Sequence, residues 1–225
     1  MHDSSTDIQA VDSQQGFPTK LLDGYRLFKQ GRFEDERERY RDLAERGQTP
    51  ETLIIACCDS RAAPETIFNT LPGELFVVRN VANLVPPYEP DGHYHSTSAA
   101  LEFAVQSLKV KHIVVLGHGR CGGIKAALDP ADEPLSPGDF IGKWMQLLEE
   151  AAGHVAANSW MTSAERQTAL ERISIRHTLA NLRTFPCVDI LEKKGRLSLS
   201  GAWFDIAEGE LWIMDPDSGD FSRAG

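Results

Sequence analysis

The fold is decided at residues 53–61, which read Leu-Ile-Ile-Ala-Cys-Cys-Asp-Ser-Arg. An apolar run that breaks into a polar turn is typical of a short buried strand and the loop that follows it. In open α/β sheets, ligands bind at the carboxyl ends of the strands. A thiol, a carboxylate and a guanidinium, from Cys57, Asp59 and Arg61, therefore stand together where a ligand is expected.

A second stretch repeats this pattern at residues 111–123, which read Lys-His-Ile-Val-Val-Leu-Gly-His-Gly-Arg-Cys-Gly-Gly. If the two strands are parallel neighbours, Cys57, His118 and Cys121 converge at one edge of the sheet. Two thiolates and one imidazole are good zinc ligands, and a site with only three protein ligands keeps a fourth position open for catalysis. We therefore expect one zinc ion per chain, with Asp59 as the nearest group to fill or guard the open position.

Composition narrows the class of protein. The chain has 225 residues and a net charge of −10, which argues against a nucleic-acid partner because nucleic acids bind basic faces. It contains no apolar run of the ~18–20 residues that would cross a membrane. The first seven residues are polar and acidic, unlike a targeting peptide. Four cysteines in a chain of this length favour metal binding or catalysis over a disulfide framework, and we expect a cytoplasmic protein.

The rest of the chain predicts an α/β fold, a central and mainly parallel β-sheet flanked by helices, with an N-terminal helical arm. Residues 1–18 are expected to form a flexible tail, and residues 19–225 a single zinc-binding domain. The arm covers residues 19–46, where Gly31 should separate two helices. Two amphipathic helices are expected near the C-terminus, before a hairpin that turns at Glu208 and Gly209.

Two motifs together indicate a family. The Cys-x-Asp-Ser-Arg motif at residues 57–61, followed by His-x-x-Cys-Gly-Gly at residues 118–123, resembles the β-class carbonic anhydrases. Recognisable pieces of this resemblance run from about Tyr25 to Ile213. It implies reversible hydration of carbon dioxide to bicarbonate and a proton by zinc-bound hydroxide. It also implies a homodimer, or a dimer of dimers, whose cleft is shared between subunits.

The resemblance assigns further roles around the metal. Gln48, nine residues before Cys57, stands where the family hydrogen-bonds its substrate. Apolar positions lining the carbon dioxide cleft match Phe76, Val81 and Phe103. The backbone that follows Cys121 begins a helix at Gly122, where amides can hold an anion such as bicarbonate.

Asp59 has two possible states in this family. When paired to Arg61 it stays off the metal and accepts a hydrogen bond from the zinc hydroxide, whereas when released it closes the site as a fourth ligand. We expect the open state at neutral to alkaline pH. Two thiolates neutralise the charge of Zn²⁺, so the bound water should ionise less readily than at a three-histidine site, and activity should rise toward alkaline pH.

Two of three positions depart from the bicarbonate-regulated members of the family, which carry Trp, Tyr and Arg where this chain has Ile54, Phe204 and Arg79. Because only the arginine remains, a regulatory bicarbonate pocket is expected to be absent. Cys58 should point away from Cys57, since adjacent strand residues face opposite sides, and we expect it to pack rather than bind metal.

Other readings remain open at this point. A structural zinc protein would close its site with four ligands and would need neither Arg61 nor an apolar slot. A redox role for Cys57 and Cys58 is weaker because no Cys-x-x-Cys motif is present. The same fold could instead hydrolyse carbon disulfide or carbonyl sulfide, which the zinc motif does not discriminate.

Overall fold

The computed structural model describes residues 13–14, 16–90, 95–129 and 133–225. The chain forms two compact units that divide after Gln48. Most of the predicted flexible tail, residues 1–18, lies outside the described residues, so the predicted boundary at residue 18 stays a prediction.

The first unit is helical. Helix α1 covers Thr19–Gln30, α2 covers Arg32–Asp35 and α3 covers Arg37–Arg46, after two short paired strands, β1 at Ser13–Gln14 and β2 at Phe17–Pro18. The break at Gly31 is confirmed, and a second break at Glu36 makes three helices where two were predicted. Aromatic rings of Phe28, Phe33 and Tyr40 pack edge-on or tilted, with centroids 5.3 to 6.0 Å apart, and hold the three helices together.

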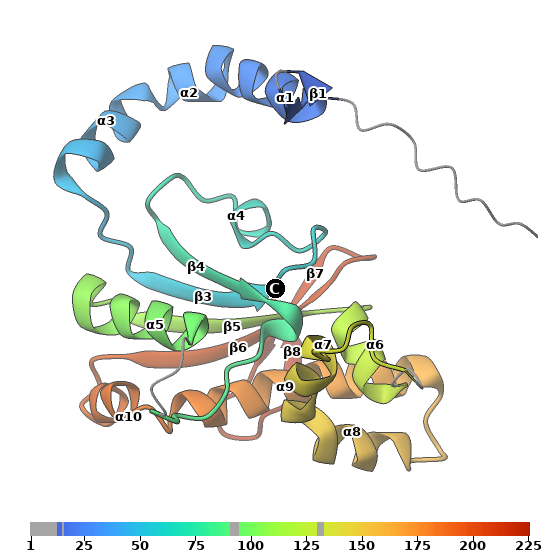
Figure 1. Cartoon of the computed structure of the whole chain (residues 1–225). Helices are drawn as coiled ribbons and strands as arrows, with labels where there is room; N and C mark the ends of the chain where they lie inside the picture. The colour runs from blue at the N-terminus through green and yellow to red at the C-terminus, as the bar shows by residue number, and fades with distance from the viewer. Residues whose placement is uncertain (1–12, 15, 91–94, 130–132) are drawn as a thin grey trace, which may run out of the picture. The chain divides into compact units, whose positions relative to one another are not determined.

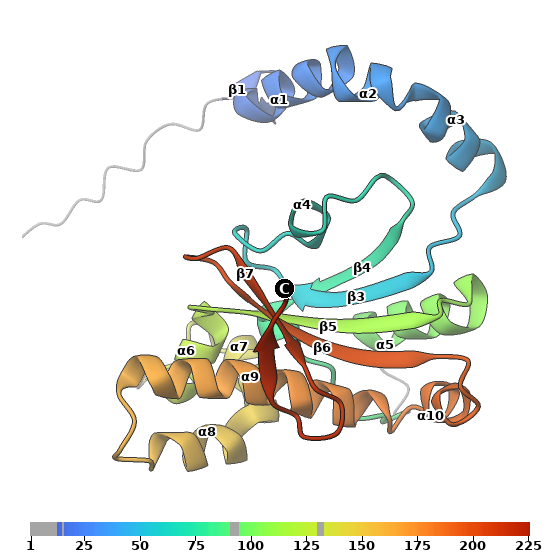
Figure 2. The same cartoon turned by 180° about the vertical axis from the view of Figure 1, so that it is seen from behind.

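The second unit is built on a six-stranded sheet in the order β4-β3-β5-β6-β7-β8 (Figures 1 and 2). Strands β4, β3, β5 and β6 pair in parallel, and the β6–β7 and β7–β8 pairs are antiparallel, which confirms the predicted mainly parallel sheet and the hairpin. The strands are β3 (Thr52–Cys57), β4 (Leu75–Asn80), β5 (His112–His118), β6 (Ser198–Asp205), β7 (Glu210–Met214) and β8 (Phe221–Arg223).

Helices surround this sheet. In both views α9 runs under one face, while α4 lies on the other side (Figures 1 and 2). Their bounds are α4 (Pro64–Ile67), α5 (Ser96–Glu102), α6 (Gly122–Leu128), α7 (Phe140–Met145), α8 (Glu149–Ala156), α9 (Ser163–Leu182) and α10 (Pro186–Lys193), with the short helical turns η1 (Val81–Asn83), η2 (Phe103–Leu108) and η3 (Gln146–Leu148).

Strand β3 buries both of its faces, as expected for a central parallel strand. Leu53 and Ile55 join the core that includes α9, whereas Ile54 and Ala56 join a second cluster on the opposite face. All four are at most 2% exposed. This explains why the sequence there is continuously apolar and does not alternate.

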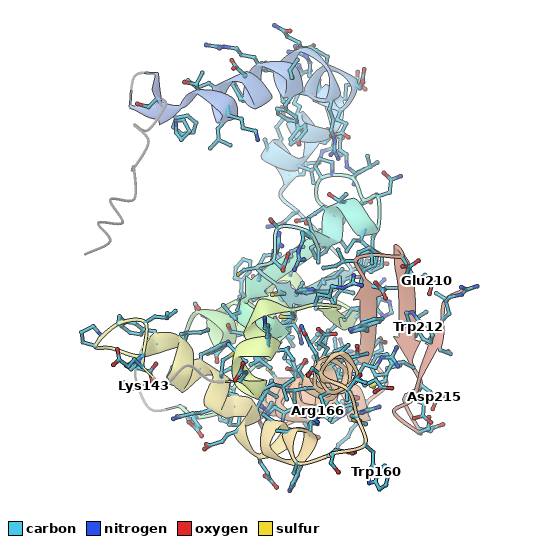
Figure 3. The ribbon with its side chains drawn as sticks, turned by 90° about the vertical axis from the view of Figure 1, so that its right-hand side faces the viewer. Lys143, Trp160, Arg166, Glu210, Trp212 and Asp215 are labelled. Atoms are coloured by element: carbon cyan, nitrogen blue, oxygen red, sulfur yellow. The ribbon has the colours of Figure 1, made fainter. Side chains whose placement is uncertain are left out.

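Helix α9 approaches the sheet closely because two strands present glycine to it. A Cβ atom on Gly117 of β5 would lie 2.8 Å from Cδ1 of Ile175, and one on Gly201 of β6 would lie 2.7 Å from Cγ2 of the same residue. The helix begins with a capping box, in which Thr162 and Glu165 satisfy each other's backbone amides. Just before it, Trp160 is 95% exposed and projects from the surface (Figure 3).

Candidate metal centre and active site

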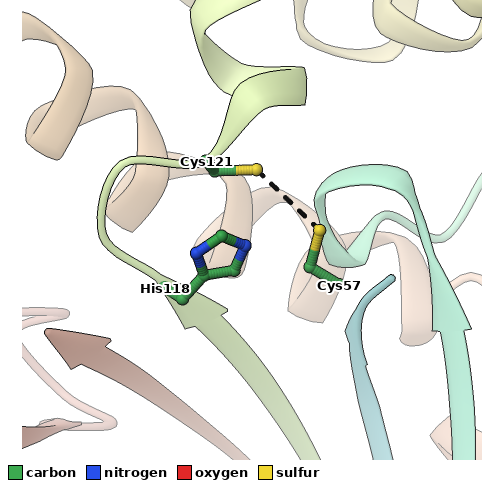
Figure 4. A group of neighbouring side chains, drawn as sticks. All are labelled: Cys57, His118 and Cys121. Atoms are coloured by element: carbon green, nitrogen blue, oxygen red, sulfur yellow. Dashed lines mark hydrogen bonds between the residues drawn. The ribbon is translucent and has the colours of Figure 1, made fainter. Parts of the chain in front are cut away.

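The predicted ligands meet at the carboxyl ends of neighbouring strands. Cys57 is the last residue of β3 and His118 the last of β5, and these strands are parallel partners. Cys121 follows after a short turn and immediately precedes α6. The ligand atoms of the three residues lie within 4.8 Å of one another, and all three side chains are buried (Figure 4).

His118 is prepared to bind a metal through Nε2. Its Nδ1 lies 2.9 Å from the carbonyl oxygen of Gly119, so Nδ1 carries the proton and donates it there. Nε2 therefore presents a lone pair, and it is buried without a hydrogen-bond partner among the described residues. A buried polar atom without a partner is costly unless something binds it. A metal ion placed between this nitrogen and the two sulfur atoms supplies the missing partner, so the residues fit zinc.

The two thiols are poised to carry negative charge. Their sulfur atoms point toward each other at 3.9 Å (Figure 4). The hydrogen bond between them lowers the pKa of Cys57 to about 4 and raises the pKa of Cys121, so one thiolate forms readily beside the other thiol. Burial opposes protonation of His118, but the nearby Cys57 thiolate and the Gly119 carbonyl outweigh it and raise the pKa of the ring. A cation at this point would stabilise both thiolates.

Backbone amides complete the surroundings of the sulfur atoms. The Ala82 amide donates to Cys57 Sγ at 3.4 Å, and the amides of Gly123 and Ile124 offset a small part of the rise in the pKa of Cys121. Ala82 reaches this position with a left-handed backbone, at φ 65°, which a residue with a Cβ adopts at a cost. The turn after β4 is thus bent toward the metal centre.

Asp59 is held by Arg61 beside the ligands. The guanidinium donates from Nε at 2.9 Å and from Nη2 at 2.7 Å, one bond to each carboxylate oxygen. This bidentate pair holds the pKa of Asp59 well below its usual range. Asp59 Oδ2 lies 3.9 Å from His118 Nε2, at the rim of the ligand cluster. Arg61 is itself anchored by a bond to the Arg120 carbonyl at 3.1 Å.

Arg79 holds the backbone of the loop that follows β3. It donates to the carbonyl of Cys57 at 2.8 Å and to that of Asp59 at 2.7 Å. The guanidinium is thereby committed to two backbone groups of this chain. That use is consistent with the expectation that a regulatory bicarbonate pocket is absent, which stays a prediction.

Glu171 is a residue that the sequence analysis missed. It lies on α9, is 1% exposed, and accepts a hydrogen bond from the Cys121 amide at 3.0 Å and from Trp203 Nε1 at 3.1 Å. Gln167, one turn earlier, donates to the Cys121 carbonyl at 3.2 Å. Helix α9 therefore binds both the backbone amide and the backbone carbonyl of Cys121. In the sequence, Glu171 stands at helical spacing with Ser174 and Thr178, which share its buried face of the helix, but this spacing alone does not show that it reaches Cys121.

The predicted substrate residues fall into two groups. Val81 packs against the core cluster that includes Cys57 and Cys121, and Gly122 leads directly from Cys121 into α6. Phe76 and Phe103 instead contact each other, with ring centroids 5.9 Å apart. Phe76 pairs in register with Leu53, four residues before Cys57, so it stands about 13 Å back along the strands at ~3.3 Å per residue.

Two further positions complete the comparison with the sequence. Gln48 is exposed and ends the first compact unit, so its role stays a prediction. The expectation that Cys58 packs is wrong, because β3 ends at Cys57 and Cys58 lies exposed in the turn beyond the sheet.

A sequence model of the family described as carbonic anhydrase matches residues 52–211, which include all of the metal centre. The chain belongs to the β-carbonic anhydrase family. Cys57, His118 and Cys121, which the paired motifs predicted as zinc ligands, form a buried cluster that could hold one metal ion, and their role as zinc ligands stays a prediction. The central, mainly parallel sheet predicted for this family is confirmed as well.

Known relatives support this membership along nearly the whole chain. Beta carbonic anhydrase 5, chloroplastic, of Arabidopsis thaliana is 39% identical over 213 residues, covering 92% of this chain and 69% of that protein. The structure of the β-carbonic anhydrase CcaA superposes with a TM-score of 0.84 at 32% identity, covering 92% of this chain and 91% of the other. A structure from Sordaria macrospora, described as a tetrameric β-carbonic anhydrase, gives a TM-score of 0.73 at 28% identity and covers 90% and 97% of the two chains.

Proposed function

We propose that this chain catalyses the reversible hydration of carbon dioxide to bicarbonate and a proton. The observation that carries the proposal is Nε2 of buried His118, which has no hydrogen-bond partner in the described part of the chain and faces two thiols beside a carboxylate held by arginine. Zinc, when bound there, supplies a Lewis acid that makes a water molecule nucleophilic at neutral to alkaline pH. The ligand set leaves one position open, because Asp59 is directed to Arg61.

Asp59 orients the attacking water. Both of its oxygens accept from Arg61, yet Oδ2 remains 3.9 Å from the metal-binding nitrogen of His118, close enough to accept a hydrogen bond from a water held at the open position. The low pKa keeps Asp59 ionised throughout the working range, so it is an acceptor and never a competing donor. Arg61 thereby both orients this carboxylate and keeps it from the metal.

Carbon dioxide needs an apolar slot because it has no dipole and few hydrogen-bonding handles. Val81 is a suitable apolar lining residue, because it packs against the core cluster that includes Cys57 and Cys121. We assign Gln48 and the Gly122 amide to hydrogen bonds with the substrate oxygens.

Phe76 and Phe103 complete the slot of a second subunit. Phe103 is 48% exposed although it is a large apolar residue, and its ring contacts Phe76 on an edge strand. Such a pair is suited to burial against a partner. We therefore propose a homodimer, or a dimer of dimers, in which each cleft is shared between subunits.

Stopped-flow measurement of carbon dioxide hydration, on protein whose zinc has been counted, tests the function. We expect about one zinc per chain and a rate that rises from mildly acidic to alkaline pH. One zinc per chain without hydration at any pH would refute the proposal, and turnover of carbon disulfide in the same sample would then identify the sulfur substrates. Equally fast hydration by a Cys57→Ser/Cys121→Ser variant would remove the metal centre from the mechanism.

We also propose a cytoplasmic location. All four cysteines are free thiols, as expected in a reducing compartment. Among the residues described, no helix is both long and apolar enough to cross a membrane. Fractionation of cells that express the tagged full chain checks the location, and recovery with an organelle or with membranes would contradict it.

A further inference from the structure

A surface cavity lies at the end of the sheet opposite the metal centre. It has a volume of about 580 Å³, within the ~300–1,000 Å³ typical of small-molecule sites. Strand β5 starts at this cavity with His112 and ends at the metal ligand His118, so the two places are separated by the whole strand. The lining residues are Lys109, Lys111, His112, Gly195, Arg196, Leu197 and Ser198.

The lining is basic in an acidic protein. It contains three cationic side chains and an imidazole but no carboxylate, whereas the whole chain carries a net charge of −10. Lys111 is paired with Glu51. Lys109 and Arg196 have neither an ion pair nor a side-chain hydrogen bond within the described parts of the chain. Two unpaired cations that face one hollow create a local positive potential that attracts anions.

The cavity lining also contains a pair of hydrogen-bonded polar side chains. His112 Nδ1 and Ser198 Oγ lie 2.8 Å apart, and the two residues are register partners on the parallel strands β5 and β6. Because the bond bridges neighbouring strands, it fixes both groups on a rigid element. The cavity thus offers hydrogen-bonding groups of fixed position in the same lining as its cationic side chains.

We propose that this cavity binds the phosphate group of a small phosphorylated molecule. A guanidinium matches two phosphate oxygens at once, and an ammonium adds a point charge, so Arg196 with Lys109 favours a doubly charged phosphate over a singly charged anion. The volume exceeds that of one phosphate and leaves room for the molecule that carries it. The site uses none of the metal-centre residues, so it is independent of the proposed function.

The test titrates pyrophosphate into the zinc-loaded full-length protein at constant ionic strength, by calorimetry. We expect saturable binding that weakens about tenfold or more in the Lys109→Gln/Arg196→Gln variant, since two charge-assisted bonds are lost. A matched control, Lys143→Gln/Arg223→Gln, removes the same charge from α7 and β8 and should stay within about twofold of the wild type. Carbon dioxide hydration by both variants should be unchanged, which shows that they are folded.

Hydrogen exchange with bound pyrophosphate locates the ligand. Protection confined to residues 109–112 and 195–198 supports the site. The affinities of inorganic phosphate and of a hexose phosphate are then compared: tighter binding of the hexose phosphate indicates a larger phosphorylated ligand, and tighter binding of inorganic phosphate indicates free phosphate. Binding that does not saturate, equal losses in the control variant, or protection at residues 118–123 would each overturn the proposal.

Discussion

Single side chains at the metal centre have separable roles, and Arg61 is the clearest case. It does not reach the ligands but fixes Asp59 through two bonds. In Arg61→Gln we expect carbon dioxide hydration to fall about tenfold or more at unchanged zinc content, because the carboxylate loses its orientation and can turn to the metal. Arg61→Lys should recover only part of the rate, since an ammonium cannot reproduce the fork. Unchanged rates in Arg61→Gln would contradict the role of the pair.

The same pair has a consequence for stability in acid. Arg61 lowers the pKa of Asp59, so the stabilisation is present above the unfolded pKa of about 4 and is lost as pH falls through the lower folded value. Arg61→Gln raises the folded pKa, and part of this stabilisation disappears. We expect its acid unfolding, followed by tryptophan fluorescence, to begin at higher pH than in the wild type. A midpoint equal to that of the wild type would show that the pair does not contribute.

Substitution of Glu171 tests whether residues that hold the Cys121 backbone contribute to metal binding. Glutamine in its place keeps the shape but turns one NH₂ group toward either the Cys121 amide or Trp203 Nε1, so two donors face each other. We expect Glu171→Gln to bind zinc about tenfold more weakly in a competition with a chelator. The control is Glu149→Gln on the exposed side of α8, which should bind zinc like the wild type. Equal affinities in all three proteins would contradict this role.

Among the elements, α9 matters most because it joins the sheet to the metal ligand. Its approach depends on Gly117, next to His118, and the contact with Ile175 leaves no room for a methyl group. We expect Gly117→Ala to destabilise the fold by about 1–3 kcal/mol in urea. Adding Ile175→Val removes the atom 2.8 Å away and should restore part of the loss.

Gly153 provides the matched control at the same scale. It lies within α8, and a Cβ there would meet nothing within 4 Å. Gly153→Ala should therefore stabilise the protein by about 0.5–1 kcal/mol, as helix propensity predicts. If both alanines had the same effect, close packing against α9 could not be the cause.

The sequence predicted the strands that carry the metal ligands because each ends in a run of chemically distinctive residues. It also predicted the pairing of Asp59 with Arg61, which lie two residues apart. It did not reveal Glu171, which reaches Cys121 across 50 residues of chain. Contacts of that kind depend on how closely a helix approaches a sheet, and the apolar pattern of the helix does not encode this distance.

At the scale of the whole molecule, the cleft is expected to need a second copy of the chain. Phe103→Glu should shift the protein toward monomers in sedimentation and lower the hydration rate, because a charge would be buried at the subunit contact. Phe140 is also exposed, at 81%, but lies on α7. Phe140→Glu should leave the assembly unchanged. Dimers of normal activity in Phe103→Glu would exclude a shared cleft at this residue.

The spacing of Cys57 and Cys121 also makes the metal-free protein sensitive to oxidation. Their sulfur atoms lie 3.9 Å apart, and a cation bound as their shared partner would keep both of them occupied as ligands. After the metal is stripped, dissolved oxygen can take two electrons from this pair and join the sulfurs. Zinc added later would then find one imidazole and no thiolate. Purification with a chelator in air should therefore turn a reversible loss of activity into one that only a reductant, given before the metal, can repair.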